Sequence, residues 1–158
     1  MIRKELNTKQ VSNLFGVDES TVRRWSLAGK INSSSSAGGH RNFSYKNIIE
    51  FVKNKGIELN LINKNQVFDR KKITKDLFNY SLKKNSQSIE ITLIKLYLNG
   101  IQLHDLMDNY IEGALVKLQR RLDLKKISVA EEHIARKIIS KSLNTFKLSI
   151  NNNKASTN

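Results

Sequence analysis

Residues 7–29 decide the fold of the first part of this 158-residue chain, and their sequence is NTKQVSNLFGVDESTVRRWSLAG. Two short amphipathic patterns follow one another in this stretch, and Gly16 lies between them. Glycine interrupts a helix because it tolerates backbone angles that other residues avoid. Two short helices joined by a glycine-bearing turn are typical of a helix-turn-helix, which we therefore predict here.

The first helix is predicted from its start signal and its apolar face. Asn7 and Gln10 have the spacing of a capping box, in which each side chain binds the backbone N–H of the other residue. Val11, Leu14 and Phe15 then fall on one side of the helix, which indicates a buried face.

The second helix is expected over residues 19–28, with Asp18 as its N-cap. Val22, Trp25 and Leu27 are its apolar residues. Gly29 is expected to end it in a left-handed conformation, as glycine commonly does at a helix C-terminus.

A serine- and glycine-rich run, NSSSSAGG, follows at residues 32–39. Side chains this small and polar cannot build a core, which predicts a mobile loop with a short extended arm on each side. Ser44 is a suitable N-cap for a third helix, whose apolar residues keep the helical period up to Gly56.

The rest of the chain is predicted to be helical. Three helices are expected over 74–84, 88–99 and 102–122, and a last helix begins at the capping box of Ser128 and Glu131. Four amphipathic helices with short joints indicate an antiparallel four-helix bundle. The apolar line of the last helix is expected to contain Ile134, Ile138, Ser142, Phe146 and Leu148.

These patterns divide the chain into four parts. We predict a helix-turn-helix domain at 1–56, a linker at 57–72, the helical bundle at 73–150, and a polar tail or start of a linker at 151–158. The predicted fold class is all-α with a small β wing, and the absence of proline agrees with helices.

The charge balance points to a polyanionic partner. The chain has 28 Lys and Arg against 14 Asp and Glu, a formal net charge of +14. Residues 1–56 carry 10 basic and 4 acidic side chains, or +6, and the other 102 residues carry +8. The first part is therefore the more basic per residue. Nucleic acid is the first expectation for the partner and an anionic membrane surface the second, while a solvated basic surface stays open on charge alone.

Several classes of protein are not expected. The absence of cysteine excludes disulfides, thiolate catalysis and Cys-ligated zinc. The longest apolar stretch, 89–101, is interrupted by polar and charged residues, and the N-terminus lacks the apolar run of a secretion signal, so we expect a soluble cytoplasmic protein without a membrane partner. With no catalytic triad, phosphate loop or paired-histidine metal motif, we expect no enzyme.

The helix-turn-helix and the glycine-rich run resemble the MerR-type winged-helix DNA-binding domain. The resemblance lies in 8–11, 20–25, 29–31 and 38–44, roughly a third of the chain. It implies that the second helix enters the major groove, where Arg can bind guanine with two hydrogen bonds, and that the GGHR loop is the wing. For Trp25, a phosphate contact and a core role both stay open. The DNA-binding residues expected are Thr8, Ser20, Thr21, Arg23, Arg24, Trp25, Lys30, His40 and Arg41.

Residues 127–133, ISVAEEH, resemble the cobalamin-binding helical cap of methionine synthase and of the CarA/CarH/LitR-type regulators. In that family a Trp precedes a Glu-His pair by nine intervening residues. Glu132 and His133 match the pair, whereas Leu122 stands at the Trp position. The resemblance implies adenosylcobalamin as the cofactor. The Rossmann-like domain that supplies the lower axial His in that family has no counterpart in these residues, so weak binding or none is expected.

Together the two resemblances imply a bacterial, nucleoid-associated transcriptional regulator, most simply a repressor. Its partners would be double-stranded operator DNA, a second copy of the chain, and a protein antirepressor that competes for the basic helix. Two alternatives stay open: a corrinoid-carrying cap module of the methyltransferase type, and an excisionase-like architectural DNA binder.

Overall fold

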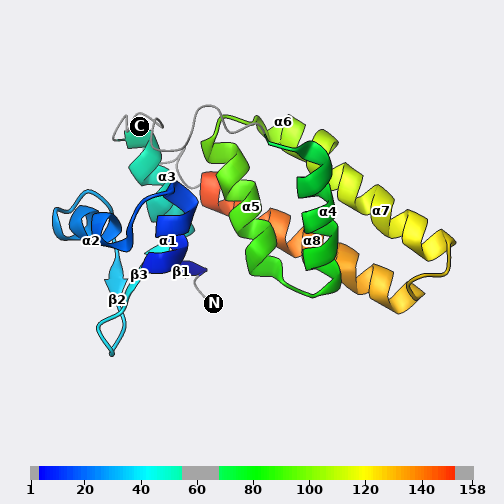
Figure 1. The fold of residues 1–158 in the computed structure, drawn as a ribbon, viewed down its shortest axis with the longest axis horizontal. Helices are drawn as coiled ribbons and strands as arrows, with labels where there is room; N and C mark the ends of the chain where they lie inside the picture. Colours follow the sequence, from blue (N-terminus) through cyan, green and yellow to red (C-terminus); the bar gives the residue numbers. More distant parts are fainter. Residues whose placement is uncertain (1–3, 55–67, 152–158) are drawn as a thin grey trace. The chain divides into compact units, whose positions relative to one another are not determined.

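The computed structural model describes residues 4–54 and 68–151, which form two compact units (Figure 1). The first unit contains residues 1–66 together with 149–158, and the second contains 67–148. The predicted domain end at Gly56, most of the predicted linker and the tail after Asn151 lie outside the described residues. The predicted fold class is confirmed: the described chain is mostly helical with a small three-stranded antiparallel sheet.

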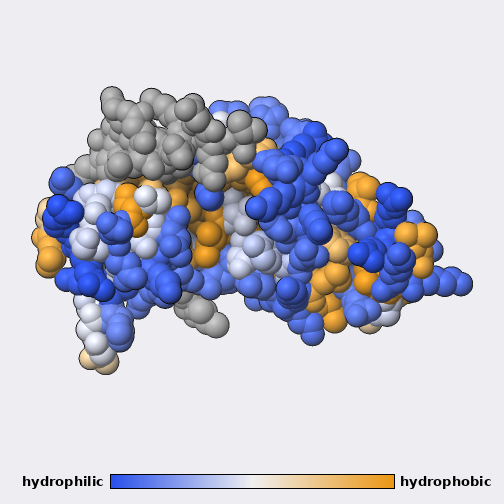
Figure 2. All heavy atoms as spheres, in the orientation of Figure 1, coloured by the Kyte–Doolittle hydropathy of each residue, from blue (hydrophilic) through white to orange (hydrophobic). Residues whose placement is uncertain are grey.

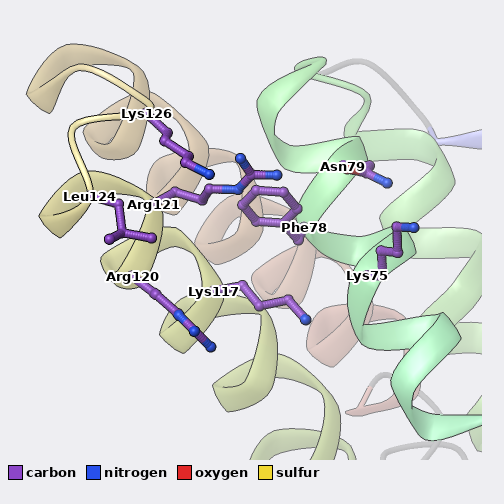
Figure 3. Close-up of a pocket in the computed structure, with 8 residues that line it drawn as sticks. All are labelled: Lys75, Phe78, Asn79, Lys117, Arg120, Arg121, Leu124 and Lys126. Carbon is purple, nitrogen blue, oxygen red and sulfur yellow. The ribbon is translucent and has the colours of Figure 1, made fainter.

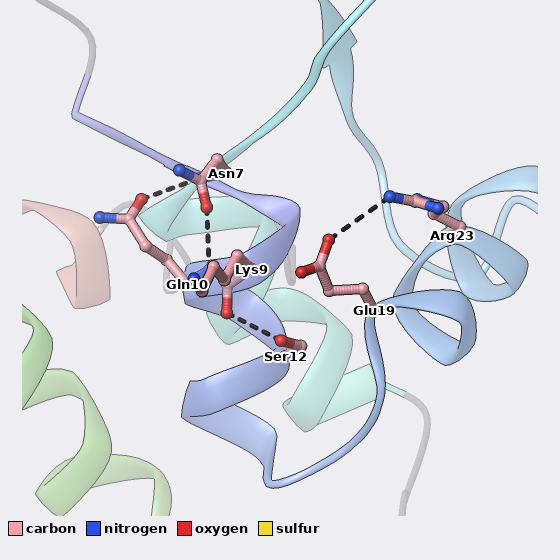
Figure 4. A network of polar contacts seen from close by, with 6 residues as sticks. All are labelled: Asn7, Lys9, Gln10, Ser12, Glu19 and Arg23. Atoms are coloured by element: carbon pink, nitrogen blue, oxygen red, sulfur yellow. Dashed lines mark hydrogen bonds and ion pairs between the residues drawn. The ribbon is translucent and has the colours of Figure 1, made fainter.

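The helix-turn-helix forms as predicted from helices α1 (Thr8–Phe15) and α2 (Glu19–Leu27). The capping box is confirmed, because the Gln10 N–H donates to Asn7 Oδ1 and the Asn7 N–H donates to Gln10 Oε1, both at 2.9 Å (Figure 4). Gly16 caps α1 in the left-handed conformation, with φ of 65°. Asp18 stands at the N-cap of α2, but its side chain makes no capping hydrogen bond.

Three short strands build the sheet, in the order β1–β3–β2. Strand β3 (Arg41–Ser44) pairs antiparallel with β1 (Glu5–Asn7) on one side and with β2 (Ser34–Ser35) on the other. β1 is absent from the sequence-based prediction, because a three-residue strand is too short to show an alternating pattern.

The serine- and glycine-rich run is more structured than a loop. Part of it is strand β2, and a turn follows in which the Gly39 N–H donates to the Ser36 carbonyl at 2.9 Å. The Ser36 N–H also donates to the His40 carbonyl at 2.9 Å, which closes the hairpin. The two arms of the predicted wing are therefore confirmed as a β-hairpin.

Helix α3 (Tyr45–Asn54) begins at the predicted cap, since the Asn47 N–H donates to Ser44 Oγ at 3.1 Å. Burial of apolar side chains from all the helices and from the sheet holds this unit together. The core consists of Leu6, Val11, Leu14, Phe15, Val22, Ile31, Phe43, Tyr45, Ile48, Ile49 and Phe51.

The second unit begins with an antiparallel pair of helices, α4 (Arg70–Leu82) and α5 (Ser86–Leu98). Each begins earlier than predicted, α4 by four residues and α5 by two, because Asp69 and Asn85 cap them through their side chains. The last three residues of the predicted linker, 70–72, are therefore helical.

The third helix of the bundle is composite, which the sequence did not indicate. A short helix α6 (Leu103–Asp105) continues into a π-helical segment η1 (Leu106–Ile111) and then into α7 (Glu112–Asp123). A π-helical turn inserts an extra residue into the helix and shifts the side chains that follow it.

The last helix, α8 (Val129–Asn151), packs on α5 and α7. The rings of Tyr97 and Phe146 meet edge to face at 5.7 Å, and Arg136 Nη2 donates to Gln119 Oε1 at 3.2 Å. The bundle is therefore made of α4, α5, the composite α6–η1–α7 helix, and α8.

The predicted buried line of α8 is wrong in part. Ile134 is 38% exposed and Leu148 is 50% exposed, whereas Ser142 and Phe146 are buried as predicted. The buried residues of the first half of the helix lie one position further along, at Ala135 and Ile139. Helix α8 has apolar residues on both neighbouring lines, so the sequence pattern alone did not decide between them.

The capping box at the start of α8 is confirmed. The Ser128 N–H donates to Glu131 Oε2 at 2.7 Å, and the Glu131 N–H donates to Ser128 Oγ at 3.1 Å. The hydrogen bond from the Ser128 backbone to the Glu131 carboxylate, and after it an interaction with the Ser128 hydroxyl, hold the pKa of this carboxyl below its usual value of 4.5. In the described ranges, no helix combines the length and apolarity that a membrane crossing needs.

Candidate nucleic-acid interface

Helix α2 has one buried and one exposed side. Val22 is fully buried against the core of its unit. The exposed side chains lie three or four residues apart, so they form a single stripe along the helix. The stripe consists of Ser20, Arg23, Arg24 and Leu27, and we call it the α2 outer face.

The two arginines of this face make only weak contacts with the protein. Arg23 Nη2 lies 3.4 Å from Glu19 Oε2 in an exposed ion pair one helical turn apart (Figure 4). Arg24 Nη2 donates to Thr21 Oγ1 at 3.3 Å. An exposed ion pair of this kind contributes less than about 1 kcal/mol, so a ligand can displace it at little cost.

Leu27 was grouped with Val22 and Trp25 as an apolar residue of this helix, but its side chain is not buried with Val22 and lies on the α2 outer face. It was not among the predicted DNA-binding residues. Its side chain is 74% exposed, the largest exposed fraction among the large apolar residues described, and Figure 2 shows hydrophobic colour at the surface over α2. The sequence did hold a signal for it, because residues 20, 23, 24 and 27 have the spacing of one helix face.

Trp25 lies in an aromatic cluster with Phe15 and Phe51. Its ring centroid is 5.8 Å from that of Phe15, edge to face, and 5.0 Å from that of Phe51. Phe15 and Phe51 are themselves 5.7 Å apart. Of the two roles left open by the sequence, these contacts favour the core role, since the indole joins α2 to both other helices of its unit.

The segment between α2 and the wing is held by hydrogen bonds. Gly29 has a φ of 67°, which confirms the predicted left-handed stop. The Lys30 N–H donates to the Trp25 carbonyl at 2.8 Å, and the Lys30 side chain stays exposed. Ser26 and Ser33 share a 2.7 Å hydrogen bond between their hydroxyls, which fixes the end of α2 beside the start of the wing.

The wing carries the two remaining predicted contacts. His40 is exposed just before β3, and Arg41 is half-buried as the first residue of that strand, paired with Ser35 of β2. Gly39 in the preceding turn has a φ of 76°, a conformation that a larger residue adopts only with strain. The hairpin thus presents a cation and an imidazole at the base of its turn.

Thr8 is the first residue of α1 and is half-buried. The structure places Thr8 in the same compact unit as the α2 outer face and the wing. It does not place Thr8 in a contact with any of the other predicted DNA-binding residues.

The residues of the predicted cobalamin site differ in their exposure. Leu122 is half-buried near the end of α7, and His133 is exposed in the first turns of α8. Glu132 is 7% exposed, and its carboxylate is already bound by Arg136 one turn later. Cobalamin binding stays a prediction from the resemblance.

Among residues 4–54 and 68–151, no three His, Asp or Glu side chains gather closely enough to hold a metal ion. No protein-family model matches the chain, and no significant match is found among curated proteins.

Proposed function

We propose that the first unit binds double-stranded DNA, with α2 in the major groove and the β2–β3 wing against the sugar-phosphate backbone of the DNA beside that groove. The observation that supports this most directly is the α2 outer face. Helix α2 buries Val22 and exposes the adjacent residues Arg23 and Arg24. Its outer side can therefore insert into a groove of the DNA while its inner side stays packed on the protein.

The chemistry of the α2 outer face suits base edges. Arg23 and Arg24 each offer the forked donors that match the O6 and N7 atoms of guanine. Ser20 and the backbone N–H groups at the start of the helix suit phosphates. Leu27 supplies an exposed apolar group of the kind that contacts a thymine methyl.

The wing adds contacts to the backbone. In this proposal Arg41 and His40 lie against phosphates on one side of α2, and Lys30 does so from the segment that joins α2 to the wing. One such helix covers only half of a typical operator, so regulation as a repressor would use two copies of the chain on a two-fold symmetric site. A protein antirepressor with an acidic surface could then compete for the same arginines.

The experiment that tests this proposal is selection of the full chain on a pool of randomised duplexes. We expect enrichment of one short motif. We also expect the logarithm of the affinity to fall linearly with the logarithm of the salt concentration. Binding without enrichment, with equal affinity for all sequences, would favour the architectural alternative. Lack of retention of any duplex at low salt would overturn the proposal.

A further inference from the structure

The second unit contains a pocket of about 350 Å³ lined by α4, α7 and the residues just after α7 (Figure 3). This volume lies in the lower range of small-ligand sites, which extend from roughly 300 to 1,000 Å³. The lining side chains are Lys75, Phe78, Asn79, Lys117, Arg120, Arg121, Leu124 and Lys126.

Five of these eight residues are cationic, and none of the described residues that line the pocket is acidic. Within the described part of the chain, none of the five has an ion-pair partner within 4.0 Å. Several cations around one hollow give it a positive potential, which favours an anion there.

A simpler explanation covers only part of this cluster. Arg120 and Arg121 lie in the last turn of α7, where cations are favourable next to the negative end of the helix dipole. Lys75 lies on a different helix, and Lys117 lies a turn earlier. The dipole of α7 therefore does not explain why these two cations line the same pocket.

One of the cations lies over an aromatic ring. The guanidinium carbon of Arg121 lies 5.8 Å from the ring centroid of Phe78, and the Phe78 side chain is only 5% exposed. Figure 3 shows Arg121 and Lys126 extending toward this ring from the α7 side, with Asn79 on α4 across the pocket. A guanidinium that rests on an aromatic ring keeps its forked donors in place for a phosphate.

We propose that this pocket binds a small molecule that carries clustered phosphate groups, such as a polyphosphate or a nucleoside polyphosphate. Clustered phosphates provide several negative charges within the reach of five cations, whereas a single carboxylate does not. A duplex displays its phosphates along an extended ridge, whereas the cations here surround one small hollow. The second unit would then be an effector-binding unit, and this proposal does not rest on DNA binding by the first.

The test is calorimetric titration of inorganic tripolyphosphate into the full chain at constant ionic strength. The double variant Lys117→Gln/Lys126→Gln removes two exposed cations of the pocket. The matched control, Lys71→Gln/Lys72→Gln, removes two exposed lysines of α4 that do not line it. We expect 1:1 binding that weakens at least about tenfold in the pocket variant and about twofold or less in the control.

A third variant, Arg121→Lys, keeps the charge but loses the planar fork, and it should weaken binding as well. Circular dichroism confirms that each variant is folded before titration. Absence of saturable binding to the wild type, or equal losses in the pocket variant and the control, would overturn the proposal.

Competition with duplex DNA distinguishes the two possible sources of phosphate, a small molecule and a nucleic-acid backbone. If a short duplex leaves tripolyphosphate binding unchanged, the pocket accepts a small molecule as proposed. If the duplex displaces tripolyphosphate and the pocket variant also loses affinity for DNA, the pocket belongs to a nucleic-acid surface and the small-molecule proposal is wrong.

Discussion

Gly113 of α7 faces Thr74 of α4 so closely that a Cβ atom on the glycine would lie 2.8 Å from Thr74 Cγ2. Real Cβ atoms do not approach another carbon this closely, so only glycine allows this contact between the two helices. Thr74 is buried, and its β-branched side chain has little rotamer freedom within a helix. The pair therefore fixes where α4 crosses α7.

We expect Gly113→Ala to destabilise the chain by about 1–2 kcal/mol, because the overpacking cost exceeds the gain in helix propensity. In a Thr74→Ser background the clashing methyl is gone, and the same substitution should be neutral or stabilising by up to about 1 kcal/mol. Urea unfolding followed by circular dichroism measures both. Equal effects in the two backgrounds would show that the contact does not limit the packing.

Arg23→Ala and Arg24→Ala should each weaken binding to the selected duplex by about 1–3 kcal/mol if these side chains reach base edges. The matched control is Lys46→Ala. Lys46 forms an exposed ion pair with Glu50 one turn away at 3.6 Å, much like the Arg23–Glu19 pair at 3.4 Å. Fluorescence anisotropy measures the affinity for the duplex. Equal losses of affinity for Lys46→Ala and Arg23→Ala would mean that Arg23 contributes only its charge and makes no specific contact with a base.

Arg41→Gln tests the wing. A phosphate contact contributes no sequence preference, so this change should weaken binding to all duplexes alike and reduce the slope of log affinity against log salt by about 1. The measurement is a salt titration of wild type and variant on the selected duplex and on an unrelated one. An unchanged slope would remove Arg41 from the set of phosphate contacts.

Substitutions of Trp25 distinguish a role in the core from a contact with a DNA phosphate. Trp25→Ala should cost about 3 kcal/mol of stability, because the ring packs on both Phe15 and Phe51. Trp25→Phe keeps an aromatic ring but loses the indole N–H, so the core role predicts nearly unchanged affinity for DNA. A large loss of affinity in a stably folded Trp25→Phe variant would instead assign the indole to a phosphate.

The capping box of α8 predicts a pH effect. The pKa of Glu131 is lowered in the folded chain, so its stabilising contribution is complete above about 4.5, its unfolded value, and is lost as pH falls through the lowered folded value. Ser128→Ala should raise this pKa only part of the way, because the Ser128 N–H still donates to the carboxylate. An NMR titration of the Glu131 side chain measures the change. A full return to the unfolded value would mean that the hydroxyl dominates.

The sequence predicted the features that depend on neighbouring residues. Both capping boxes, the left-handed glycines at the ends of helices and the wing are encoded within a few positions, as the pairs Asn7–Gln10 and Ser128–Glu131 show. The α2 outer face was also largely predictable, since its spacing is visible in the sequence, although Leu27 was expected with the apolar residues Val22 and Trp25 and is exposed instead.

Features that depend on distant parts of the chain could not be predicted. Strand β1 exists because Leu6 pairs with Phe43, which lies far along the sequence. The π-helical segment η1 interrupts a pattern that is periodic on either side of it. The charged pocket needed the fold, since Lys75 and Arg121 are 46 positions apart in the sequence and lie on separate helices.

The aromatic cluster of the first unit also provides an optical label. Trp25 is the only tryptophan of the chain, whereas Tyr80, Tyr97 and Tyr110 all belong to the second unit. Fluorescence excited beyond the absorption of tyrosine therefore reports the unfolding of the first unit alone. Far-ultraviolet circular dichroism reports the helices of both units, so a comparison of the two signals shows whether they unfold together.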